Sequence, residues 1–134
     1  MKTIFLILTL LWGFSAAHMV GGWRDKNVED DDVKRIANFV VSENNKQSDS
    51  PYCEKLVEVI NASTQIVAGI NYRITFDTAP TSCLKNDQNC SEMTDCSVLE
   101  CAPHKRCVAN IWSKPWLNST RIENIEYTER SNSC

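Results

Sequence analysis

Seven cysteines are the feature that most constrains the fold of this 134-residue chain. In an oxidising compartment such cysteines pair, and each bridge stabilises a small domain by roughly 2 to 4 kcal/mol because it restricts the unfolded chain. Their odd number leaves one thiol free, intermolecular or linked to a small thiol, and about a hundred pairing patterns of three bridges are open. The cysteines stand at positions Cys53, Cys83, Cys90, Cys96, Cys101, Cys107 and Cys134.

Zinc binding is the rival use of clustered cysteines. The stretch from Cys83 to Cys107 contains neither a Cys-x-x-Cys pair nor two neighbouring histidines. Because zinc sites depend on such spacings, the pattern favours disulfides and no metal.

The first residues, "MKTIFLILTLLWGFSAAHMV", combine one lysine, an apolar run from Ile4 to Phe14 and small residues at a cleavage position. This pattern predicts a signal peptide over residues 1–17, a mature chain beginning at His18, and secretion into the extracellular space. The apolar run is about half the roughly 20 residues that span a membrane, so we expect no membrane anchor.

Residues 18–134 are enough for a single domain with one core. The whole chain carries 14 basic and 17 acidic residues, a formal net charge of -3. An acidic balance does not favour nucleic acid or anionic lipid, so the expected partner is a protein or a small molecule.

Apolar residues recur at steps of three and four from Val28 to Glu43, which predicts an amphipathic helix with acidic residues in its first turn and Asn27 as its cap. A polar loop, "NNKQSDSPY" from Asn44 to Tyr52, follows. Apolar residues then predict strands over 55–62, 70–77, 107–112 and 121–128, the second with perfect alternation. We therefore expect an α+β fold: an antiparallel β-sheet of four to five strands wrapped around one long α-helix.

The sequence offers little for catalysis. His18 and His104 are its only histidines, and no phosphate-binding loop or His-Glu-x-x-His motif occurs. A catalytic cysteine would need an activated thiolate, which a secreted, cysteine-rich chain does not favour. We expect a protein that is not an enzyme and needs no cofactor.

Three short stretches carry apolar residues or glycines at positions that we expect to be exposed to solvent. They are "MVGGW", "QIVAG" at a hairpin tip, and "SKPWLNS" between two strands. Each has a structural alternative, namely a frayed terminus, a hairpin whose apolar residues face the core, and a tryptophan folded back onto the sheet. As exposed segments they would form a binding surface, since an exposed tryptophan in a loop is a frequent anchor.

Together, "MVGGW", the helix, "QIVAG" as a Gln-x-Val-x-Gly motif, a cysteine-bearing loop and "CVANIWSKPW" resemble, in order, a secreted type 2 cystatin. The resemblance implies a reversible, tight-binding inhibitor of papain-like cysteine proteases of the cathepsin L, S, B and C class, acting by occlusion of the cleft. The alternative is a cystatin-fold binding module that inhibits weakly and acts on a receptor or another protein. The implied contact residues are Met19, Val20, Gly21 as hinge, Gly22, Gln65, Ile66, Val67, Ala68, Gly69, Pro115 and Trp116.

The family usually has two consecutive bridges, which implies Cys83–Cys96 and Cys107–Cys134 here. Cys90 and Cys101 compete for the first bridge, and Cys53 is a rival partner for either or a link between chains. We expect a monomer, with a disulfide-linked or domain-swapped dimer as the alternative.

Some cystatins also block legumain through an asparagine in the loop after the helix. The corresponding stretch here is Ser48-Asp49-Ser50, so we expect no strong legumain inhibition. Glycosylation motifs begin at Asn61, Asn118 and, more weakly, Asn89.

Overall fold

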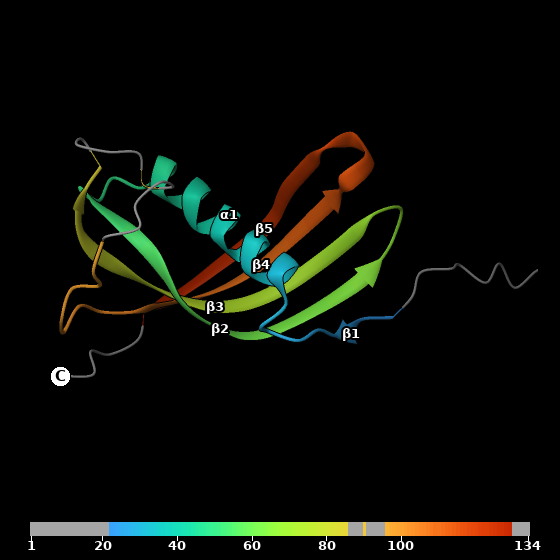
Figure 1. Cartoon of the computed structure of the whole chain (residues 1–134), viewed down its shortest axis with the longest axis horizontal. Coiled ribbons are helices and arrows are strands. Elements are labelled where there is room, and N and C mark those ends of the chain that lie inside the picture. Colours follow the sequence, from blue (N-terminus) through green and yellow to red (C-terminus); the bar gives the residue numbers. More distant parts are fainter. Residues whose placement is uncertain (1–21, 86–89, 91–95, 130–134) are drawn as a thin grey trace, which may run out of the picture.

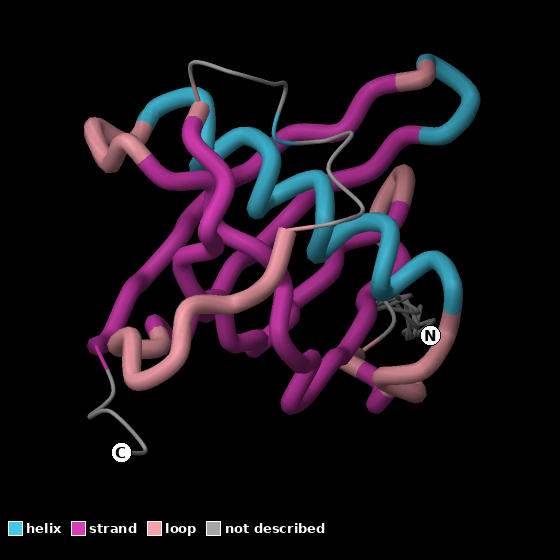
Figure 2. Tube along the Cα trace, turned by 60° about the vertical axis from the view of Figure 1, so that its left-hand side comes forward, coloured by secondary structure: helices cyan, strands magenta, loops and turns pink. Residues whose placement is uncertain are grey.

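The computed structural model describes residues 22–85, 90 and 96–129 of the chain. Within them, one helix lies across one face of a five-stranded antiparallel sheet of order β1-β2-β3-β4-β5 (Figures 1 and 2). The predicted α+β fold is confirmed. The elements are β1 (Arg24–Asp25), α1 (Asp31–Gln47), β2 (Tyr52–Ile66), β3 (Ile70–Leu84), β4 (Lys105–Lys114), the short 3₁₀ helix η2 (Pro115–Leu117) and β5 (Ser119–Glu129).

The core forms between the inward face of the sheet and the apolar face of α1. Alternate residues of β3 and β4 point inward because side chains alternate across a strand. Each large apolar side chain buried here contributes about 1.5 to 3 kcal/mol to folding. The buried core consists of Val33, Ile36, Ala37, Val40, Val41, Val59, Ala62, Tyr72, Ile74, Phe76, Cys107, Ala109 and Ile111.

Helix α1 begins later than the sequence predicts. The Asn27 side chain accepts a hydrogen bond from the Glu29 backbone N–H at 2.9 Å, but it does not cap the helix. Asp30 holds the cap position, and the first turn carries Asp31 and Asp32, whose charges favour the positive end of the helix dipole. Asn27 therefore orders the turn before the helix.

The helix also runs past its predicted end, because its last turn is anchored to β2. Asn45 is buried, donates to the Glu54 carbonyl oxygen at 3.0 Å and accepts from the Glu54 N–H at 2.8 Å. These two bonds hold residues up to Gln47 in helical conformation, although the apolar pattern ends at Glu43.

A buried carboxylate organises the end of the sheet beneath the last turn of α1. The Glu54 side chain lies 3.1 Å from Lys105 Nζ and accepts from Asn44 Nδ2 at 2.8 Å. Tyr127 in turn donates its hydroxyl to Asn44 Oδ1 at 3.0 Å, and burial raises the pKa of Tyr127 to about 12. This network joins α1 to β2, β4 and β5.

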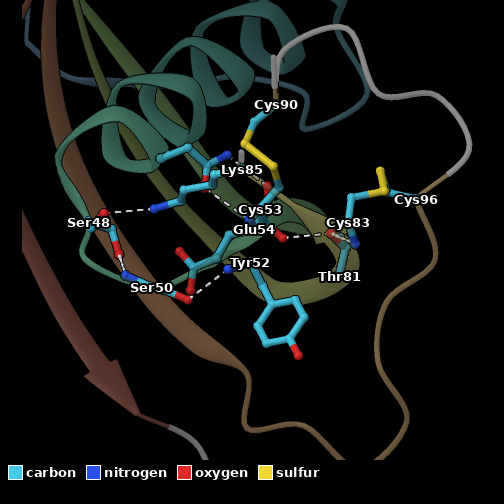
Figure 3. The surroundings of a disulfide bond; sticks show 11 residues. Ser48, Ser50, Tyr52, Cys53, Glu54, Thr81, Cys83, Lys85, Cys90 and Cys96 are labelled. Carbon is cyan, nitrogen blue, oxygen red and sulfur yellow. Dashed lines mark hydrogen bonds between the residues drawn. A yellow bond between two sulfur atoms is a disulfide. The ribbon is translucent and has the colours of Figure 1, made fainter. Parts of the chain in front are cut away.

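Two disulfides link cysteines that follow β3 in the chain to the start of β2 and the end of β3. One joins Cys83 to Cys96, the pair implied by the resemblance, and the other joins Cys53 to Cys90 (Figure 3). Cys53 therefore pairs within its own chain. Cys101 is disulfide-bonded as well.

The expected bridge from Cys107 to Cys134 is wrong. Cys107 is a free thiol, 1% exposed, on the inward face of β4 opposite Phe76. Burial raises the pKa of its thiol to about 11. At this position the residue packs as a small apolar side chain, and Cys134 lies outside the described residues.

Candidate functional site

The hairpin that joins β2 to β3 and the turn that joins β4 to β5 lie at the same end of the molecule (Figure 1). The hairpin tip is Gln65–Gly69 and the turn is Pro115–Leu117. We refer to these two segments together as the wedge. The last turn of α1 lies toward the opposite end (Figure 1). The disulfides of Cys53 and Cys83 belong to that end too, because Cys53 is at the start of β2 and Cys83 at the end of β3.

The hairpin tip presents one large apolar side chain to solvent. Ile66 pairs with Ile70 to close the hairpin, and Ile66 is 69% exposed. The turn between them has Val67 half-buried, Ala68 exposed and Gly69 buried, with the Val67 N–H donating to the Gly69 carbonyl oxygen at 3.0 Å. Of the predicted tip residues, Ile66 is thus the one that presents a large apolar side chain to solvent.

Gly69 is required by both the backbone conformation and the space around it. Its φ of +126° is one that residues with a side chain rarely adopt. A Cβ at this position would lie 2.6 Å from the Ser113 carbonyl oxygen and 2.9 Å from Trp112 Nε1. The glycine therefore lets the tip pack directly against β4.

The turn after β4 exposes two large apolar side chains. Trp116 is 64% exposed and Leu117 is 62% exposed. Pro115 opens the 3₁₀ turn, where its fixed φ is preorganised, and Asn118 closes it in the left-handed conformation, with its N–H donating to the Pro115 carbonyl oxygen at 3.0 Å. Leu117 is not among the contact residues predicted from the sequence, although an apolar residue directly after an exposed tryptophan and before a turn asparagine is a usable signal.

The strand ladder fixes the two parts of the wedge relative to each other. Ile70, the first residue of β3, pairs with Ser113, two residues before Pro115. The tip and the turn are therefore the adjoining ends of neighbouring strands. Their apolar side chains project from one rigid edge.

The chain enters the sheet beside the wedge. In the ladder between β1 and β2, Arg24 pairs with Thr64 and Asp25 with Ser63, so the direction of β1 places Trp23 and Gly22 toward the hairpin tip. Gly22 is exposed, and no atom lies within 4 Å of where its Cβ would be. The predicted contact residues Met19, Val20 and Gly21 lie outside the described residues.

The exposed residues of the wedge are apolar, and no titratable group belongs to either of its segments. The part of the chain that the structure describes has no group of three His, Cys, Asp or Glu side chains placed to hold a metal ion. In the same part, no helix is long and apolar enough to cross a membrane.

Both described glycosylation motifs begin at exposed asparagines. Asn61 lies on β2, and Asn118 lies two residues after Trp116. A glycan on Asn118 would stand beside the wedge, whereas Asn61 is remote from the turn along the sheet.

Comparisons with known proteins show which family this chain resembles. A family model described as "Cystatin domain" matches residues 21–116, a range that contains the whole hairpin tip and ends at Trp116. The chain is 50% identical to Cystatin-1 of Chilobrachys guangxiensis over 134 residues, covering 100% of both chains. It is 35% identical to L-cystatin of Tachypleus tridentatus, covering 92% of each.

A solved structure gives the same fold at lower sequence similarity. The crystal structure of dimeric human cystatin F superposes with a TM-score of 0.77 at 20% identity, over 91% of this chain and 98% of that one. At that identity the likeness concerns the fold alone.

Proposed function

Since the chain belongs to the cystatin family, we propose that it is a secreted, reversible and tight-binding inhibitor of papain-like cysteine proteases of the cathepsin L, S, B and C class. Cystatins are inhibitors rather than enzymes, and the family match and the relatives support inhibition of cysteine proteases in general. The observation that carries the finer proposal is the exposure of Ile66, Trp116 and Leu117 on one rigid edge.

The proposed mechanism is occlusion of the active-site cleft. The hairpin tip enters the centre of the cleft, where Ile66 is buried against apolar walls, and Pro115 and Trp116 cover the primed side. No peptide bond of the inhibitor has to be presented to the catalytic cysteine for attack. Met19 and Val20 fill the non-primed subsites, with Gly21 and Gly22 allowing the arm to bend.

The rigidity of the wedge supports tight binding. A backbone already held in place loses little conformational entropy on association, so more of the interaction free energy appears as affinity. The packing of Gly69 against Ser113 and the ladder between β3 and β4 provide that rigidity. An interface of standard size, roughly 1,600 Å², then supports nanomolar binding.

The proposal includes processing and secretion. Removal of residues 1–17 leaves residues 18–134 as one domain that acts as a monomer without a cofactor. The disulfides Cys53–Cys90 and Cys83–Cys96 fit an oxidising, extracellular environment.

We propose that legumain is not a strong target. The loop after the helix carries Ser48 and Ser50, whose hydroxyls accept the backbone N–H groups of Ser50 and Tyr52, and it offers no asparagine. The nearest asparagines, Asn44 and Asn45, are both held by Glu54. Nanomolar inhibition of legumain by the recombinant protein would contradict this.

The test is titration of papain and of cathepsins L, S, B and C with the refolded mature protein, residues 18–134. We expect inhibition constants in about the nanomolar range for at least one enzyme. The matched control replaces both Ile66 and Trp116 with alanine, which removes the exposed anchors and leaves the core intact. No inhibition at micromolar concentrations of the folded protein would refute the proposal.

A further inference from the structure

A row of cationic and aromatic side chains crosses the outer face of the sheet, opposite the helix, next to the wedge. The Arg73 guanidinium lies 4.3 Å from the ring centroid of Trp23, and Lys114 Nζ lies 3.6 Å from that of Trp112. Arg121 of β5 stands opposite Trp112 in the ladder. We call Arg73, Lys114 and Arg121 the cationic band.

The alternation of the strands places the band on the outer face. Arg73 lies between Tyr72 and Ile74, both of which are buried against α1, so its own side chain points the other way. Trp112 likewise follows the buried Ile111. The two tryptophan rings support the cations from beneath and limit their motion, as cation–π contacts do.

No ion pair of the described residues neutralises the band, although two carboxylates flank it. Asp25 lies across β2 from Arg73, because both pair with Ser63, and Glu123 follows Arg121 by two residues. Residues 59–76 and 101–122 contain no aspartate or glutamate. Among the described residues, no ion pair involves a member of the band. By contrast, Lys105 and Arg106, at the other end of β4, are paired with Glu54 and Asp77.

This local positive charge stands out because the whole chain is acidic, with a formal net charge of -3. The chain thus concentrates unpaired cations beside its proposed contact surface, while carboxylates predominate elsewhere. Like-signed clusters of this kind steer charged partners toward one face.

The band is continuous with the wedge. Lys114 directly precedes Pro115. Trp23, whose ring lies against the Arg73 guanidinium, directly follows Gly22. A protease that receives the wedge in its cleft must therefore bring the surface flanking that cleft over the band.

We propose that the cationic band makes the inhibitor selective for papain-like proteases whose clefts are flanked by carboxylates, by accelerating their association. This inference rests on the proposed function. Charges at the rim of an interface act mainly on the association rate constant, and salt screens them, whereas the buried apolar anchors act on dissociation.

The experiment compares the association rate constants of the wild-type inhibitor and an Arg73→Gln/Lys114→Gln/Arg121→Gln variant. Two papain-like proteases serve as partners, one chosen for carboxylates and the other for basic residues flanking the cleft. Rates are measured at about 20 and about 300 mM salt. The matched control is Lys46→Gln/Lys55→Gln/Lys85→Gln, which removes the same charge near the end of α1, the start of β2 and the end of β3.

With the acidic-rimmed protease at low salt, we expect the band variant to associate about tenfold more slowly than wild type and to lose most of the salt dependence. Dissociation should change little, and the control variant should retain most of the wild-type rate and its salt dependence. With the basic-rimmed protease, the band variant should associate faster than wild type.

Equal association rates and equal salt dependence of the band variant and wild type would overturn the inference, while inhibition by both would leave the proposed function standing. Another outcome is a band variant that inhibits with wild-type rate constants and differs from the wild type only by weaker retention on a sulfated polysaccharide. That result would also overturn the inference, because it would show that the band binds polyanions rather than proteases. Absence of inhibition by the wild-type protein would instead refute the proposed function.

Discussion

Replacing Gly69 with alanine tests the structural basis of the wedge most directly. The φ of +126° costs a residue with a side chain about 1 to 3 kcal/mol. The new Cβ would also lie 2.6 Å from the Ser113 carbonyl oxygen, a backbone atom held in the central ladder. Since β4 cannot withdraw without breaking that ladder, the hairpin tip must move away from it.

We expect Gly69→Ala to lower the free energy of unfolding by about 1 to 3 kcal/mol. Because the moving tip carries Ile66 away from Trp116, the inhibition constant for papain should rise about 10- to 100-fold, which corresponds to roughly 1.4 to 2.8 kcal/mol. Urea unfolding gives the first quantity, and progress curves of papain inhibition give the second.

Gly22→Ala is the matched control for the stability measurement, because no atom lies within 4 Å of its Cβ position and its φ is not positive. This variant should unfold at the wild-type urea concentration. If Gly69→Ala leaves both the unfolding midpoint and the inhibition constant unchanged, the assigned role of the glycine is wrong.

Four further outcomes follow. Trp116→Ala should weaken inhibition by about 2 kcal/mol, with the urea midpoint unchanged because the side chain is 64% exposed; an unchanged inhibition constant would remove it from the contact surface. Ala68→Gly should raise stability by up to about 1 kcal/mol, since Ala68 has a φ of 39°, and a destabilised variant would contradict this. Replacing Cys53 and Cys90 with alanine should lower the free energy of unfolding by at most about 4 kcal/mol, given the sequence separation of 37 between them. Inhibition should be unchanged at a temperature where the variant stays folded, and weaker inhibition by the folded variant would show that this bond is coupled to the wedge. Burial raises the pKa of the Cys107 thiol from its ordinary 9.0 to about 11. Its contribution to the free energy of unfolding is therefore complete below about pH 9 and is lost as the pH rises through 11. Cys107→Ala should flatten the alkaline fall in urea stability, and a pH profile identical to that of the wild type would refute this.

The regular parts of the fold follow from periodicity. The steps of three and four in α1 and the perfect alternation from Ile70 to Asp77 identify which faces are buried, because burial repeats with the geometry of the element. The two-residue strand β1 has no period to detect. In β2, register shifts such as the one between Val59 and Asn61 interrupt the alternation, so its true length was hidden.

For Cys107, the family resemblance and the local sequence pattern predict different roles. The stretch from Cys107 to Trp112 predicts a strand, and its alternation places Cys107 on the same face as Ala109 and Ile111. A residue on that face is covered by the helix and is a poor candidate for a bridge. The family's bridge pattern implies a disulfide from Cys107, but in the structure Cys107 is a free thiol buried in the core.

Local sequence patterns did not reveal two other features because both depend on long-range contacts. The helix extends to Gln47 only because Asn45 finds Glu54, and neither residue signals the other in the sequence. The need for glycine at position 69 depends on Ser113, which is brought close by the ladder alone. By contrast, the exposure of Ile66 and Trp116 agrees with the interpretation of these stretches as binding segments.

The burial of Cys107 also bears on how the chain acquires its disulfides. While the chain is unfolded, seven thiols compete in exchange, and about a hundred sets of three bridges are accessible. Once the sheet has closed over α1, Cys107 is withdrawn from exchange, and six cysteines allow only about fifteen sets. Oxidative maturation should therefore be most faithful when the hydrophobic core condenses before the bridges form, and conditions that favour collapse under mild reduction should give fewer scrambled isomers than rapid oxidation of the unfolded chain.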